Sequence, residues 1–219
     1  MTLSPIEFIW VGGQHNWKRS HRRYIKSFLK PCLEFGQSIV RESLRIPLDI
    51  DTVEVELCPR DVGYRATADS ASQCSFYFKK YEITRKKMEG CEDYYAWVAT
   101  HEGVHCSRMN FINDDSIIEL AATEGLAYAA EIHDCAEYVE DISGLGKEAE
   151  ELLASFLEDP ATHREGPPTE EESKWLARGR NDWHNLAERI GMYCIQRHLC
   201  EGYTYQDMIY APPEDLITL

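Results

Sequence analysis

Residues 101–105 read His-Glu-Gly-Val-His and lie inside a segment, 93–109, whose residue spacing predicts an α-helix. In a helix His101 and His105 are one turn apart, so both imidazoles lie on one face and can reach the same metal ion at about 2.0–2.1 Å. Glu102 is rotated away from that face, but its carboxylate can lean over an open coordination position and accept a proton from water. The segment therefore predicts a zinc site that combines two ligands with a general base.

A catalytic zinc needs a third protein ligand and one open position. The pattern with a third histidine on the same segment is excluded, because the chain has Arg108 and Phe111 where that pattern needs glycine and histidine. The motif also has competing interpretations. It could be a charged, solvated helix whose histidines only pack against neighbours, or a fortuitous match in a structural protein.

Two glutamates on the next predicted helix, residues 115–139, are candidates for the third ligand. Five residues separate Glu119 from Glu124, which corresponds to about 140° of helix rotation, so the two do not easily face one metal. We choose Glu124, because Gly125 beside it would let this helix approach the helix of residues 93–109 closely. Glu119, with the aspartates at 114 and 115, is interpreted as an acceptor for a ligand imidazole N–H or as an exposed carboxylate.

The two metal segments, 101–105 and 123–127, resemble the gluzincins, the superfamily of thermolysin and aminopeptidase N, in which a downstream glutamate is the third zinc ligand. The chain is more closely similar to a bacterial-type family of predicted zinc-dependent proteases. That family pairs an HExxH helix with an SEGLA-like segment and ends on segments like residues 189–193 and 205–216. The resemblance covers roughly residues 90–219, with Thr123 where the family often has serine.

This resemblance implies an α+β fold of the zincin type and a bound Zn2+ with His101, His105 and Glu124 as ligands. It implies zinc-dependent hydrolysis of peptide bonds with Glu102 as the base. The chain has no exopeptidase segment of the aminopeptidase kind, so we expect an endopeptidase acting on peptides or partly unfolded proteins. The alternative from another class is a zinc-stabilised binding or chaperone-like module without significant catalysis.

Hydrolysis also needs a donor for the oxyanion besides the metal, and in thermolysin-like enzymes a Tyr, His or Arg of the C-terminal lobe serves. Five side chains near the C-terminus are our candidates: His184, Arg189, Tyr193, Tyr203 and Tyr205. Packing or a surface position is the competing interpretation for each. We prefer His184 and Tyr193 as catalytic residues, because they lie on the predicted helix 180–200, which we expect to face a cleft.

The remaining segments predict how the chain is divided. Apolar spacing predicts a helix from 18 to about 44, interrupted near Pro31. Alternation predicts a strand at 52–58, and a second strand is expected at 75–78 after a loop from 63 to 72. We therefore expect one metallopeptidase domain, 1–219, in two lobes. The lobe 1–110 carries a small sheet and the HExxH helix, and the mainly helical lobe 111–219 carries the third ligand.

Composition indicates which partners and which cellular compartment are expected. The chain has 38 acidic against 23 basic residues and a formal net charge of −15, which argues against nucleic acid and anionic lipid as partners. It has no membrane-length apolar segment and no secretory leader at its start, so a cytoplasmic location is expected. The eight cysteines form no CxxC pair and are predicted to be reduced thiols, several of them buried.

Overall fold

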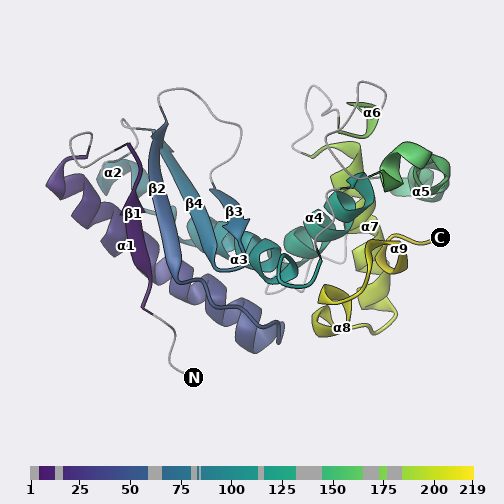
Figure 1. Cartoon of the computed structure of the whole chain (residues 1–219), viewed down its shortest axis with the longest axis horizontal. Helices are drawn as coiled ribbons and strands as arrows, with labels where there is room; N and C mark the ends of the chain where they lie inside the picture. The colour runs from purple at the N-terminus through teal and green to yellow at the C-terminus, as the bar shows by residue number, and fades with distance from the viewer. Residues whose placement is uncertain are drawn as a thin grey trace. The chain divides into compact units, whose positions relative to one another are not determined.

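The structure is a computed structural model that describes residues 5–12, 17–58, 66–79, 83, 85–112, 116–131, 145–164, 173–176 and 184–219. The chain divides into two compact units, Met1–Asn110 and Phe111–Leu219. The first unit combines a small mixed sheet with helices, and the second is built mainly from helices (Figure 1). The α+β class predicted from the sequence is therefore confirmed.

The sheet of the first unit has four strands in the order β1-β2-β4-β3. The strands are β1 (Glu7–Trp10), β2 (Thr52–Cys58), β3 (Ala66–Ser70) and β4 (Gln73–Lys79). β1, β2 and β4 are parallel, and β3 pairs antiparallel with β4 at the edge. β2 confirms the strand predicted from alternation, and Val53 and Val55 are fully buried. β3 was expected to be loop, because its small polar residues carry no strand pattern.

Two helices pack together on the sheet of the first unit, α1 (Arg19–Ser38) and α3 (Glu92–Arg108). The expected interruption at Pro31 is wrong, since α1 continues through this residue. The helix instead changes its hydrogen bonding at a π-helical turn, Ile39–Ser43, where the Leu44 N–H donates to the Ile39 carbonyl over 3.0 Å. A proline removes one hydrogen-bond donor from a helix, and its ring crowds the preceding turn. Packing of the surrounding apolar face can outweigh this destabilisation.

The buried face of α3 differs from the one that helical spacing predicts, a stripe made of Tyr94, Trp97, Val98, His101, Val104 and His105. Tyr94 and Trp97 of that stripe are 46% and 45% exposed, while Tyr95 packs against Phe28 and Phe78 with ring centroids 5.2 and 5.6 Å away. The helix itself was predicted at 93–109 and is confirmed within one residue at each end. Aromatic residues on both faces made the orientation of α3 ambiguous in sequence, and contact with α1 and the sheet decides it.

The second unit is centred on α4 (Ile117–Glu131) and α7 (Leu186–Cys200), which pack closely together. A Cβ added at Gly191 would lie 1.7 Å from the Ala121 carbonyl oxygen, and one at Gly125 would lie 2.4 Å from the Gly191 carbonyl carbon. Gly125 therefore brings α4 against α7. Approach to the HExxH helix was the expected reason for this glycine, and its contact with α7 was not expected.

Shorter helices complete the description of both units. They are α2 (Arg85–Met88), α5 (Ala149–Glu158), α6 (Ser173–Leu176), α8 (Tyr205–Ile209) and α9 (Pro213–Leu216), with 3-10 turns at Gly146–Glu148 and Pro160–His163. α9 begins at Pro213, the second of two consecutive prolines, and proline is favoured in the first turn of a helix. Among the helices in the described ranges, none combines the length and the hydropathy of a membrane span.

Candidate metal centre

The two histidines of the HExxH segment lie one turn apart on α3 and face each other. Their Nε2 atoms are 3.0 Å apart and their ring centroids 4.8 Å apart. Two ligands at about 2.0–2.1 Å from a tetrahedral zinc are roughly 3.3 Å apart, so the observed pair needs only a small adjustment to share one ion. His101 is 9% exposed and His105 is half-buried, so the pair lies at the edge of the core and not in open solvent.

α3 is held in place by close contact with α1 and the segment that follows it. A Cβ at Gly36 of α1 would lie 2.8 Å from both the Ala99 Cβ and the Thr100 nitrogen, so only glycine permits this crossing. Near the end of α3, the Ser107 hydroxyl donates to the Pro47 carbonyl over 2.9 Å. These contacts fix the helix on both sides of the histidines, which limits how far the rings can move apart.

Glu102 lies on the buried side of α3, next to His101. Its side chain is 8% exposed, and its negative charge is one of the causes, after burial, that raise the pKa of the Cys106 and Cys74 thiols. Both thiols are fully buried and protonated at neutral pH, which suits a packing role. The Glu102 carboxylate therefore lies near enough to the buried thiols of α3 and β4 to act on both.

The cysteines of both units bear on the prediction of reduced thiols. Six cysteines of the described ranges carry free thiols: Cys32, Cys74, Cys91, Cys106, Cys194 and Cys200. Four of these, Cys32, Cys74, Cys106 and Cys194, are buried, which matches the expectation of buried reduced thiols. None of the six belongs to the candidate ligand set.

Within the second unit, Glu124 lies in the middle of α4 and is half-buried. Glu119, five residues earlier on the same helix, is 6% exposed and accepts a hydrogen bond from the Thr123 hydroxyl over 2.5 Å. The interpretation of Glu119 as an exposed carboxylate is therefore wrong. The aspartates at 114 and 115 lie outside the described residues.

Among the His, Cys, Asp and Glu side chains that the structure describes, one group of three could hold a metal ion. Its members are His101, His105 and Glu124, whose ligand atoms all lie within 4.8 Å of one another. Two imidazoles and one carboxylate are a donor set that suits zinc, and three ligands leave a position open in a tetrahedral site. The residues present therefore fit the predicted ion, and Glu119 is not part of the group.

The structure distinguishes the two predicted oxyanion donors. His184 lies before the start of α7, with Nδ1 3.3 Å from Glu188 Oε2 and its ring 4.3 Å from the Tyr128 ring of α4. Tyr128 is one turn beyond Glu124, so His184 lies beside the part of α4 that carries the candidate ligand. The Tyr193 hydroxyl is instead 3.5 Å from Glu150 on α5.

The supporting role of Glu188 was missed in the sequence, although a signal for it was present. Asn185 and Glu188 form a capping box, in which each side chain accepts a hydrogen bond from the backbone of the other. This box starts α7 at Leu186, so the predicted start near 180 is wrong and residues 177–183 lie outside the described residues. The same glutamate that caps the helix orients the imidazole of His184.

Comparisons of the chain with protein-family models, curated proteins and solved structures found no match.

Proposed function

We propose that the chain is a zinc-dependent endopeptidase of the gluzincin type with a zincin-like fold. In this proposal His101, His105 and Glu124 hold the zinc, and Glu102 is the general base. The observation that supports it is that the ligand atoms of His101, His105 and Glu124 lie within 4.8 Å of one another. A structural zinc is closed by four protein ligands, whereas a set of two histidines and one glutamate leaves the open position that catalysis needs.

A zinc ion held by these ligands would act as a Lewis acid toward a water molecule and the substrate carbonyl. A carboxylate oxygen of Glu102 accepts a proton from the water as the water oxygen adds to the peptide carbonyl carbon. Glu102 then gives this proton to the leaving nitrogen as the C–N bond breaks. The carboxylate returns to its starting state, so protons and bonds balance over the cycle.

His184 is the better of the two predicted donors for the developing oxyanion. In the imidazolium form, Nδ1–H donates to Glu188 and Nε2–H remains as a second donor. Such a preoriented donor typically contributes about 10²–10³ in rate. Tyr193 is less suited to this role, because its hydroxyl is directed to Glu150.

The proposal is tested by measuring zinc content and proteolysis of an unfolded peptide library with the same protein samples. We expect one zinc per chain in the unmodified protein and none after His101→Ala. His163→Ala is the matched control, since His163 is an exposed histidine of the second unit whose Nε2 lies 3.2 Å from the Leu157 backbone carbonyl. It should keep the zinc and the activity.

The other outcomes identify the competing functions. Stoichiometric zinc without any cleavage would favour the zinc-stabilised binding module. Absence of zinc from protein prepared without chelators would mean that the HExxH segment is fortuitous.

A further inference from the structure

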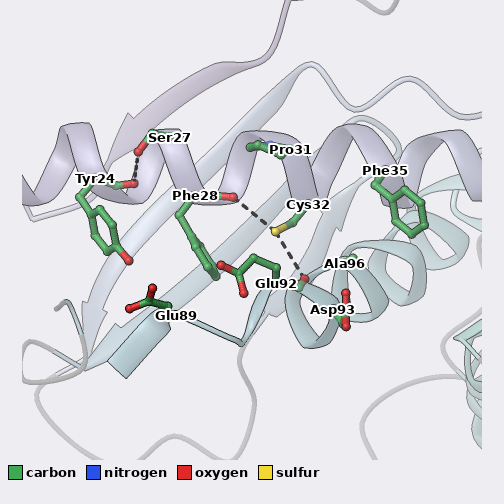
Figure 2. Close-up of a pocket in the computed structure, with 10 residues that line it drawn as sticks. All are labelled: Tyr24, Ser27, Phe28, Pro31, Cys32, Phe35, Glu89, Glu92, Asp93 and Ala96. Atoms are coloured by element: carbon green, nitrogen blue, oxygen red, sulfur yellow. Dashed lines mark hydrogen bonds between the residues drawn. The ribbon is translucent and has the colours of Figure 1, made fainter. Parts of the chain in front are cut away.

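A groove lies in the first unit where α1 and the beginning of α3 diverge (Figure 2). The two helices touch at Gly36 and Ala99, and the groove opens on the side of that contact toward the N-terminus of both helices. Its volume is about 430 Å³, which is within the range of pockets that hold small ligands. Neither histidine of the candidate metal centre lines it, so the groove is a separate feature.

One wall of the groove is an apolar stripe of α1. Its members recur at helical spacing: Tyr24, Phe28, Pro31, Cys32 and Phe35. Phe28 is buried and fixed at the base by edge-to-face packing on Tyr95, with ring centroids 5.2 Å apart. Phe35, in contrast, is 51% exposed at the edge. The groove therefore offers aromatic surface to an incoming group.

The opposite side of the groove is acidic. Glu89, Glu92 and Asp93 line it and are exposed, and no Lys, Arg or His is among the described residues that line it. Glu92 and Asp93 also lie in the first turn of α3, where negative charge stabilises a helix, and Glu92 accepts a hydrogen bond from the Gly90 N–H over 2.8 Å. Helix stabilisation does not account for Glu89, which precedes the helix.

The thiol at the base of the groove is a hydrogen-bond donor and not a nucleophile. Cys32 Sγ lies 3.3 Å from the Phe28 carbonyl and 3.5 Å from the Glu92 carbonyl, and Figure 2 shows both contacts. Burial, and after it the negative charge of Glu92, raises the pKa of this thiol to about 11. The thiol stays protonated at neutral pH, so the groove would hold a ligand without covalent chemistry.

We propose that this groove binds a segment of a basic peptide through an arginine side chain. A guanidinium group stacks on aromatic rings and donates to carboxylates in a fixed planar geometry, which are the two kinds of surface that the groove presents. Tyr24 and Phe35 are eleven residues apart on α1, about 16 Å at ~1.5 Å per residue, which is the length of roughly five residues of extended chain. This length favours a peptide over a free amino acid.

The proposal requires neither the metal nor hydrolysis, so it can be tested on the purified chain whatever the outcome at the metal centre. A ¹⁵N-labelled sample is titrated with an acetylated and amidated peptide of alternating glycine and arginine. The amide of Gly90, which donates to Glu92, is the reporter. The control peptide carries citrulline in place of arginine, because citrulline has the same shape without the charge. We expect the arginine peptide to shift the Gly90 signal and to bind at least fivefold more tightly than the control.

Variants distinguish binding at the groove from nonspecific attraction of a basic peptide to the negatively charged protein. Glu89→Gln with Asp93→Asn should weaken binding by about fivefold or more, and Phe35→Ala by about two- to fivefold. The matched control is Glu34→Gln with Glu42→Gln, which removes the same charge from α1 and the π-helical turn that follows it, outside the groove. This control should change binding by less than about twofold.

Three results would overturn the assignment. The citrulline peptide could bind as tightly as the arginine peptide, the control pair could weaken binding as much as the groove pair, or the peptide could bind without a change at Gly90. The amide spectra of the variants report at the same time that each remains folded.

Discussion

Two Glu-Gly pairs occur in the helices that carry the candidate ligands, Glu102-Gly103 on α3 and Glu124-Gly125 on α4. Their surroundings differ. A Cβ at Gly103 would meet the ends of two flexible side chains, Leu48 Cδ2 at 2.9 Å and Val40 Cγ2 at 3.2 Å. A Cβ at Gly125 would meet the α7 backbone at 2.4 Å. The glutamates differ too, since Glu102 is buried and Glu124 half-buried.

This difference separates two reasons for the same dipeptide. On α3, glycine sits beside side chains that can rotate, so the position tolerates change and the importance of the pair lies in its glutamate. On α4, glycine permits contact between two backbones, which cannot move without shifting a whole helix. The pair on α4 therefore combines a proposed ligand with a packing requirement, and substitutions should separate the two.

The largest effect is expected at Glu102. Glu102→Gln keeps the size of the side chain but cannot accept a proton, so turnover of a peptide substrate should fall by about 10²–10⁴. Zinc content, measured by elemental analysis, should remain at the unmodified level. A variant that keeps near-normal turnover would exclude the proposed base.

The second effect concerns the glutamate of the other pair. Glu124→Gln should lower zinc affinity by more than about 100-fold, since even changes to groups that only support a ligand cost about 10–100-fold. Competition with a chromogenic chelator measures this. Glu119→Gln is the control on the same helix and should retain zinc. If the Glu119 variant lost zinc and the Glu124 variant kept it, the assignment of the third ligand would be reversed.

For the glycines of the two pairs the order is reversed, and the larger effect is expected on α4. Gly125→Ala is expected to lower the free energy of unfolding by about 2–3 kcal/mol, because the methyl group has to push α4 away from α7. Gly103→Ala should cost less than about 1 kcal/mol, since alanine favours the helix by a similar amount and the neighbouring side chains can adjust. Urea denaturation of both variants measures the difference. Equal losses would mean that the α4 to α7 contact is looser than described.

The comparison also shows what the sequence could and could not predict. Alternation identified β2, and periodicity identified α3 within one residue at each end, because both patterns depend on local spacing. β3 exists through pairing with β4, and its small polar residues carry no local signal. The role of Gly125 likewise depends on which helix lies opposite it, and spacing does not contain that information. The choice of His101, His105 and Glu124 rested on chemistry, and these are the residues that the structure groups.

The smallest effect is expected at the residue that precedes the second pair. Thr123 is 8% exposed and donates its hydroxyl to the buried Glu119 carboxylate. Thr123→Val keeps the shape of the side chain but leaves that carboxylate without this donor, which should cost about 1–2 kcal/mol of unfolding free energy. Thr123→Ser keeps the hydroxyl and should cost less than about 0.5 kcal/mol. Both variants should retain zinc, because Thr123 contributes no ligand atom. Urea denaturation midpoints measure the two losses, and a valine variant as stable as the serine variant would show that this hydrogen bond contributes nothing to the packing of α4.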